Sequence, residues 1–171
     1  MTQPRAKGAR RIARLALLTA ISLTIFMLEA QLPPPAPIPG VKLGLANIVT
    51  LYAVFALGPG DALLILTARV ILGAVFSGQM MTLFYSGGGG LLALASMLLL
   101  RRLLSQRQMW LCSPVAAVFH NIGQLLVAAA VMRTWAVFTY LPYLIISGIA
   151  AGLLTGVAAQ FLLGRLSRIK T

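Results

Sequence analysis

Residues 80–100, with the sequence MMTLFYSGGGGLLALASMLLL, contain no charged side chain. About 20 consecutive apolar residues are enough for a helix to cross the roughly 30 Å hydrocarbon core of a bilayer. A short polar break at 77–79 precedes this stretch, and Arg101 and Arg102 follow it directly. The stretch therefore predicts one transmembrane helix whose ends are marked by polar residues.

The composition of the whole chain agrees with this interpretation. Hydrophobic residues make up 60% of the 171 residues, charged residues only 9%, and the mean hydropathy is +0.95. A soluble domain of this size needs more polar surface to cover its core, so we expect lipid to be the main solvent around the fold. The single cysteine, Cys112, provides neither a disulfide framework nor a metal cluster.

Hydrophobic runs separated by Gly, Pro or charged residues predict an all-α membrane protein with a single domain over residues 1–171. We expect a bundle of six transmembrane helices at about 12–31, 43–58, 61–77, 80–100, 110–132 and 138–164. The second run is short, so five spans with a re-entrant segment are the alternative. The first run resembles a signal peptide in its basic start. It is longer than a typical signal core, however, and we expect it to be retained.

The distribution of positive charge predicts the orientation of this bundle. The net charge is +12, and the cations lie at the ends of apolar runs, which favours a role in topology over nucleic-acid binding. With the N-terminus inside, the basic N-terminus (1–11), the loop after residue 100 and the basic tail (165–171) face the cytoplasm of a bacterial cell. Eleven of the fourteen cations then lie inside: Arg5, Lys7, Arg10, Arg11, Arg14, Arg101, Arg102, Arg107, Arg165, Arg168 and Lys170. We therefore expect both termini in the cytoplasm and a Pro-rich loop (32–42) outside.

Motifs for catalysis are missing from the sequence. Gly87 to Gly90 resemble a phosphate loop, but no Lys-Ser or Lys-Thr follows them, so we expect no ATP hydrolysis. A single histidine with no cysteine partner and two carboxylates argues against a metal site and a hydrolytic triad. We expect a protein that is not an enzyme and uses no cofactor.

Small residues recur at helical spacing in three of the predicted spans. Gly148, Gly152 and Gly156 share one face of the sixth span, and this face allows another backbone to approach closely. We expect it to pack within the bundle rather than against a separate subunit. Ala16 and Ala20 form a smaller face on the first span. The run of four glycines costs helix stability, roughly 1 kcal/mol per Gly relative to Ala, so it predicts a tight crossing or a bend facing a ligand cavity.

Polar side chains within the predicted spans are candidate binding residues. Arg69 lies near the middle of the third span, where insertion scales assign an arginine a cost of roughly 2.5 to 3.5 kcal/mol. It either bonds to carbonyl groups or snorkels outward, or it binds an anion in a polar cavity, and we favour the anion. His120, Asn121 and Gln124 lie close together on the fifth span. They form either interhelical hydrogen bonds or the wall of a binding site, and both interpretations remain open.

The Pro-rich loop leads into two further candidates. Prolines restrict the backbone, so residues 32–42 predict a shaped external loop rather than a flexible linker. Lys42 is expected at the outer mouth, where a cation attracts an anionic solute, and Asn47 lies one turn deeper. A snorkelling lysine followed by a helix cap is the competing interpretation.

Four motifs occur in a recognisable order: Pro37-Ile-Pro-Gly-Val-Lys-Leu-Gly-Leu-Ala-Asn47, Arg69-Val-Ile-Leu-Gly73, Ser86-Gly-Gly-Gly-Gly90 and His120-Asn-Ile-Gly-Gln124. Together they resemble the Gx transporter family, often labelled heptaprenyl diphosphate synthase component I, over nearly the whole chain. That family in turn resembles the substrate-binding S components of energy-coupling factor (ECF) vitamin transporters. This resemblance implies six helices with both termini inside and an outer gating loop, here residues 32–42. It also implies that Ala16 and Ala20 contact a coupling subunit.

Two functions are consistent with these observations. The first is a transport module that captures a small anionic or carbonyl-rich solute with Lys42, Asn47, Arg69, His120, Asn121 and Gln124, and passes it to a coupling subunit driven by two separate ATPase subunits. The second is a membrane accessory subunit of a heptaprenyl diphosphate synthase or quinone-pathway complex. Prenyl diphosphate synthases bind magnesium diphosphate through Asp-rich motifs, and Glu29 and Asp61 alone cannot build these. The synthase label therefore implies a non-catalytic role.

Overall fold

The computed structural model describes residues 4–33 and 42–169, with the side chains of residues 8–33 and 42–165. The described residues form helices, turns and coil, with no β-strand. Most of the Pro-rich loop and parts of both basic termini lie outside the described residues. The elements are α1 (Pro4–Glu29), α2 (Asn47–Ala56), α3 (Pro59–Ser77), α4 (Met80–Leu100), η1 (Gln106–Gln108), α5 (Met109–Met132), η2 (Trp135–Tyr140) and α6 (Leu141–Ile169).

Five of the six α-helices are long and apolar enough to cross a membrane. The predicted second span (43–58) is wrong in extent, because α2 has 10 residues and the helix begins only at Asn47. At 1.5 Å per residue, such a helix is about 15 Å long, roughly half of the hydrocarbon thickness. The chain is therefore an all-α membrane protein whose described residues form six α-helices, and of these α2 is too short to cross by itself.

Glycine and proline set the ends of α3. Gly58 precedes the helix at φ 126°, a conformation that suits glycine, and Pro59 follows at a first-turn position where no N–H is needed. Gly78 ends the helix at φ 65° and donates its backbone N–H to the carbonyl of Val75. Two tight turns thus connect α2 to α3 and α3 to α4, which makes these helices antiparallel neighbours.

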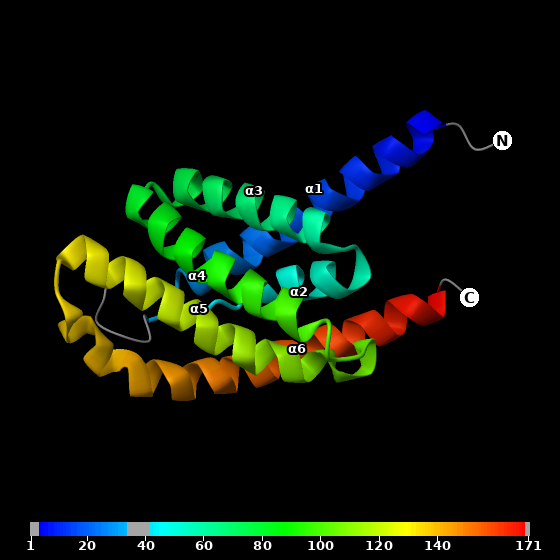
Figure 1. Ribbon diagram of the computed structural model, residues 1–171. Coiled ribbons are helices and arrows are strands. Elements are labelled where there is room, and N and C mark those ends of the chain that lie inside the picture. The colour runs from blue at the N-terminus through cyan, green and yellow to red at the C-terminus, as the bar shows by residue number, and fades with distance from the viewer. Residues whose placement is uncertain (1–3, 34–41, 170–171) are drawn as a thin grey trace.

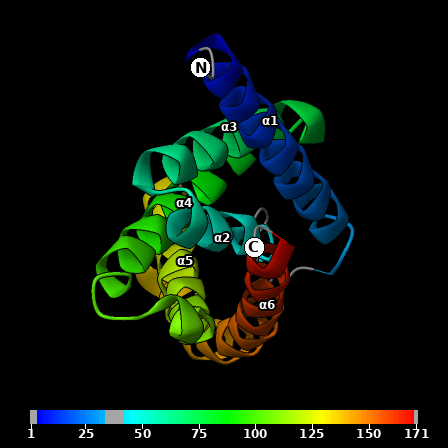
Figure 2. The ribbon, with the colours of Figure 1, turned by 90° about the vertical axis from the view of Figure 1, so that its right-hand side faces the viewer.

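The helices form an elongated bundle with both chain termini at one end (Figure 1). Viewed from that end, α2 lies in the middle of the bundle, with α1 on the outside (Figure 2). Contacts agree with the view, because α2 touches α1, α3, α4, α5 and α6. Most of its side chains are buried, so the short helix forms part of the core.

The face of α6 formed by Gly148, Gly152 and Gly156 packs against α5 inside the bundle. A Cβ atom on Gly152 would lie 2.5 Å from Cα of Pro114, and one on Gly156 would lie 2.6 Å from the carbonyl oxygen of Trp110. Distances below 3.0 Å to backbone atoms leave no room for a side chain. The two helices are therefore in backbone-to-backbone contact along this face.

The glycine run of α4 makes the second close crossing, and α4 continues through it as one unbroken helix from Met80 to Leu100. A Cβ on Gly123 of α5 would lie 2.6 Å from the carbonyl oxygen of Gly88 and 2.8 Å from Cα of Gly89. The predicted tight crossing is thus present between α4 and α5. The last two glycines of the run, Gly89 and Gly90, also face polar side chains.

One ion pair within 4 Å joins the described side chains, and it lies at the end of the bundle that holds the termini. Nη2 of Arg11 donates to Oδ1 of Asp61 at 2.6 Å. The start of α1 is thereby tied to the start of α3. Asp61 is therefore paired with Arg11.

Candidate functional site

Polar side chains from several helices gather in the interior, and the first of them is Glu29 at the end of α1. This carboxylate is 5% exposed. Its Oε1 accepts the backbone N–H of Gly44 at 2.6 Å, and its Oε2 accepts that of Leu45 at 3.0 Å. A carboxylate that receives two backbone N–H groups is well hydrogen-bonded despite its burial. Glu29 therefore fixes the segment that leads into α2.

Lys42 begins the described part of this segment, and it lies against the bundle rather than free at its mouth. Its Nζ stands 3.6 Å from the centroid of the Phe26 ring, a cation–π contact. Its backbone N–H donates to Oε1 of Gln124 at 3.2 Å. Burial lowers the pKa of the Lys42 ammonium and nearby Arg69 lowers it further, while the Glu29 carboxylate acts in the opposite direction.

Gly44 brings the same segment against the fifth helix. Its φ is 82°, and a Cβ at this position would lie 2.8 Å from Cδ2 of His120 and 2.9 Å from Nδ2 of Asn47. Only glycine combines this backbone conformation with so close an approach. The backbone at residue 44, the imidazole of His120 and the amide of Asn47 are therefore neighbours.

Arg69 enters the same region from α3, where it is 2% exposed. Its guanidinium carbon lies 5.7 Å from the centroid of the Phe26 ring, the same ring that contacts Lys42. The charge of Arg69 is close enough to act on Glu29. Phe26, which is itself 2% exposed, thus contacts two cations with its ring.

The last two glycines of the α4 run make room for these side chains. A Cβ on Gly89 would lie 2.9 Å from Nδ1 of His120 and 2.8 Å from Cγ of Gln124. One on Gly90 would lie 3.5 Å from Nη2 of Arg69. We call the set of polar side chains brought together here the polar cluster. It consists of Glu29, Lys42, Asn47, Arg69, His120 and Gln124.

Several atoms of the polar cluster are buried without a hydrogen-bond partner among the described residues. They are Nδ2 of Asn47, Nε and Nη2 of Arg69, Nδ1 of His120 and Nε2 of Gln124. Leaving one buried polar group unsatisfied costs about 1–3 kcal/mol, and more when the group is charged. Such groups are rare in native interiors and call for an explanation, such as a ligand or ordered water that completes them.

Asn121 stands beside the polar cluster but turns toward α6. Its Nδ2 donates to the backbone carbonyl of Leu144 at 2.6 Å, and a Cβ on Gly148 would lie 2.6 Å from the same nitrogen. Of the three polar residues singled out on the fifth span, this one forms an interhelical hydrogen bond. Its Oδ1 is buried without a partner among the described residues.

Ala16 and Ala20 lie far from these residues, exposed on the outer face of α1. No described residue of the bundle buries them. They form part of the surface that faces lipid or another protein.

Two residues at the cluster were not singled out as binding residues from the sequence. Glu29 and Phe26 both lie in the apolar first span, and an acidic residue there was one signal, because the chain contains only two carboxylates. Phe26 gave no signal, since one phenylalanine in a hydrophobic run looks like any other lipid-facing residue.

The fold and the polar cluster define a multi-helix membrane protein with a buried, cation-rich polar site. The chain belongs to the family described as heptaprenyl diphosphate synthase component I, whose model matches residues 18–162. The match covers all of the cluster residues. Among curated proteins and solved structures, none matches this chain.

Proposed function

We propose that this protein is a non-catalytic membrane component that binds a small anionic or carbonyl-rich solute in the polar cluster. The observation that carries the proposal is the set of buried, unpaired polar atoms on Asn47, Arg69 and Gln124. A solute that accepts hydrogen bonds would satisfy the donors in this set and offset the cost of burying them. With neither a ligand nor ordered water, these unsatisfied groups would destabilise the fold.

The chemistry of the cluster supports a ligand that accepts hydrogen bonds. Arg69, the Asn47 amide nitrogen and the Gln124 amide nitrogen are donors, and Lys42 adds a second cation at the edge. The one carboxylate, Glu29, already receives the N–H groups of Gly44 and Leu45. The planar guanidinium of Arg69 suits a carboxylate, phosphate or carbonyl group of the solute.

The family description supports a partner that makes heptaprenyl diphosphate, in a synthase or quinone-pathway complex. Both carboxylates of the chain are already engaged within the fold, which supports a non-catalytic role for this chain in such a complex. Asp61 pairs with Arg11, and Glu29 holds the lead-in of α2. Neither is available to bind magnesium diphosphate, which needs several oxygen ligands around the metal. The catalytic groups would belong to the partner.

The arrangement of the chain supports an even number of membrane crossings. Residues 43–46 precede α2 without helical structure. Leu45 and Ala46 form a turn that leads directly into α2, so this segment supplies only part of the length that α2, at about 15 Å, lacks for a crossing. A sixth crossing of this kind agrees with both termini at one end of the bundle (Figure 1). We assign that end to the cytoplasm of a bacterial cell, because the basic segments lie there.

A second candidate function is a substrate-binding subunit of an ECF-type transporter. One observation favours it: Ala16 and Ala20 lie exposed on α1, where no described residue covers this small-residue face. A coupling subunit would cover this face by close helix packing. In this case the polar cluster would bind the transported solute, with two ATPase subunits driving its release.

Mass spectrometry of small molecules that copurify with the protein tests solute binding. Wild type would be compared with Arg69→Met, and with Arg133→Met as the control, because Arg133 is exposed at the end of α5. We expect one anionic or carbonyl-rich compound in the wild type and the control, and at least about tenfold less in Arg69→Met, the effect of losing about 1.4 kcal/mol of binding free energy. Equal amounts in all three proteins, or none in any, would contradict solute binding at the cluster.

Copurification of proteins distinguishes the two partners. Solubilisation in a mild detergent, with the chain tagged, should recover a soluble prenyltransferase if the family description applies to this chain. Recovery of two ATPase subunits with a membrane coupling subunit would support the transporter instead. Ala16→Leu with Ala20→Leu should abolish only the second association, because the larger side chains prevent close packing on α1.

A further inference from the structure

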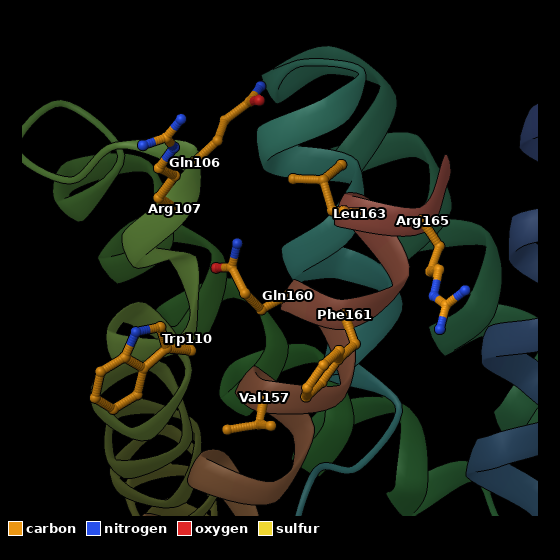
Figure 3. Close-up of a pocket in the computed structure, with 9 residues that line it drawn as sticks. Gln106, Arg107, Trp110, Val157, Gln160, Phe161, Leu163 and Arg165 are labelled. Atoms are coloured by element: carbon orange, nitrogen blue, oxygen red, sulfur yellow. The ribbon is translucent and has the colours of Figure 1, made fainter. Parts of the chain in front are cut away.

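A groove of about 880 Å³ lies at the end of the bundle opposite the polar cluster. It is formed by η1, the first turn of α5 and the last turns of α6 (Figure 3). Trp110 in this groove precedes His120 by ten residues, which is about 15 Å along α5. The groove is therefore separate from the polar cluster, and a ligand in it would bind independently of the solute proposed above.

The groove has a basic end and an apolar end. Gln106 and Arg107 lie at one end in Figure 3, and Trp110, Val157 and Phe161 lie at the other. Arg165 adds a second cation from α6, although its side chain is directed away from Gln106 and Arg107 in Figure 3, and no acidic residue is among the described residues that line the groove. The cations thus have no carboxylate partner within it, which favours an anion as the ligand.

The apolar wall is exposed rather than closed by the fold. The exposed fractions are 72% for Phe161, 43% for Val157 and 37% for Trp110. These residues belong to the helices that cross the membrane, whereas Arg107 and Arg165 stand where the apolar sequences end. Tryptophan is enriched at this boundary between hydrocarbon and headgroups. The groove therefore extends across the boundary between the hydrocarbon core and the headgroups of the membrane.

Gln160 supplies a second observation that points to a ligand. Its side chain extends from α6 toward α5 between the two ends of the groove (Figure 3). Its Oε1 is buried and has no partner among the described residues. Oε1 can accept only from a donor such as a headgroup hydroxyl, whereas Nε2 of the same amide can donate to a phosphate oxygen. The groove wall beside it is fixed, because Gln106 donates from Nε2 to the carbonyl of Phe55 at 3.3 Å.

We propose that this groove binds an amphiphile with a phosphate headgroup, such that the phosphate contacts Arg107, Arg165 adds positive charge from the other side of α6, and the hydrocarbon chain lies along Trp110, Val157 and Phe161. Guanidinium groups bind phosphate oxygens through paired, charge-assisted hydrogen bonds. The volume is within the range of ligand pockets in proteins. Two sources carry this chemistry, an anionic phospholipid of the bilayer and a free prenyl diphosphate.

Tryptophan fluorescence tests the proposal in the full-length protein. The chain has two tryptophans, so Trp135→Phe leaves Trp110 in the groove as the only reporter. The protein would be placed in phosphatidylcholine nanodiscs that contain either brominated phosphatidylglycerol or brominated phosphatidylcholine as the quencher. If the ligand is an anionic phospholipid, brominated phosphatidylglycerol should quench Trp110 at about tenfold lower content than brominated phosphatidylcholine does. The reason is that two cations each favour an anionic headgroup.

The second arm uses geranylgeranyl diphosphate in nanodiscs without brominated lipid. A free prenyl diphosphate source predicts a saturable change in Trp110 emission and a bound adduct in native mass spectrometry. For either source, the variant with Arg107→Gln and Arg165→Gln should lose at least about fivefold in affinity, because two charges that attract the phosphate are removed. The control with Arg101→Gln and Arg102→Gln removes two cations near the same end that do not line the groove, and it should bind as before.

Three results would overturn the proposal. The first is equal quenching by both brominated lipids with no response to the prenyl diphosphate. The second is equal loss of binding in the double variant and its control, which would show a diffuse effect of positive charge. The third is binding that the double variant retains in full.

Discussion

The α5–α6 interface and the polar cluster both depend on glycine, but they use the space differently. At the interface, the space beside Gly152 is filled by the backbone of Pro114. In the cluster, the space beside Gly89 is filled by His120 and Gln124, which keep buried atoms without partners among the described residues. Around Gly152 backbone atoms fill the space, and among the described residues of the interface Oδ1 of Asn121 is a buried atom without a partner, whereas the cluster holds several such atoms. The comparison indicates that glycine serves packing in one region and a binding site in the other.

The interface should be the most sensitive region to added volume. Gly152→Ala places a Cβ 2.5 Å from Cα of Pro114, and a backbone atom cannot move aside as a side chain can. We expect a loss of about 3 kcal/mol or more of stability, and a large drop in the melting temperature of the protein in detergent. Gly60→Ala is the control, because a Cβ there meets nothing within 4 Å. Equal melting temperatures for the two variants would remove the distinction between the regions.

Glu29 should be the most sensitive cluster residue in terms of stability. Glu29→Gln replaces one acceptor oxygen with a donor, so either Gly44 or Leu45 loses its buried partner. The expected cost is about 1–3 kcal/mol. The matched variant is Asp61→Asn, which breaks a pair with an exposed arginine and should leave the melting temperature nearly unchanged. A larger effect at Asp61 than at Glu29 would contradict the proposed role of Glu29.

Within the cluster, added volume should affect binding more than folding. Gly89→Ala places a Cβ 2.8–2.9 Å from the side chains of Gln124 and His120, which can shift by changing their rotamers. We expect at least about a tenfold loss of bound solute, or about 1.4 kcal/mol, with a smaller drop in melting temperature than in Gly152→Ala. Gly87→Ala is the control in the same helix, because its Cβ would lie 4.0 Å from Cγ1 of Val70. If both variants retain the solute, the site lies elsewhere.

The pH dependence of solute binding should report on Lys42. Burial, the largest influence, lowers the pKa of this ammonium below its ordinary value. As pH rises, Lys42 in the folded protein loses its proton before a solvent-exposed lysine does. The unfolded chain then binds more protons, so in this window stability rises with pH while the affinity for an anionic solute falls. Lys42→Arg keeps its charge and should remove this decline in affinity when binding is measured from about pH 7 to about pH 10.

Much of the fold could be predicted from the sequence, because lipid imposes long apolar helices. The close packing of the glycine face of α6 and the end of α3 at Gly78 could both be predicted from the sequence pattern. The true extent of α2 was not, since the apolar residues Leu43 and Leu45 look helical while the lead-in is held in a non-helical conformation by Glu29. That contact joins residues far apart in the sequence, and no local pattern encodes it.

The candidate site was predictable in its residue types but not in its geometry. An arginine in the middle of α3 and a histidine on α5 stand out in apolar sequence. Helical spacing groups His120, Asn121 and Gln124, but it does not reveal that Asn121 bonds to Leu144 of α6 while Gln124 receives the N–H of Lys42. These directions depend on how three helices pack, which periodicity alone does not determine.

The melting temperature of ligand-free Arg69→Met tests the central claim most directly. A buried, incompletely paired arginine lowers the stability of the ligand-free protein. Methionine removes the buried charge and keeps an unbranched apolar side chain in its place. If the cluster is a binding site, the variant should be more stable than the ligand-free wild type, by about 1–4 kcal/mol, and should fail to bind the solute. A lower melting temperature with solute binding intact would show that Arg69 is structural and would contradict the account.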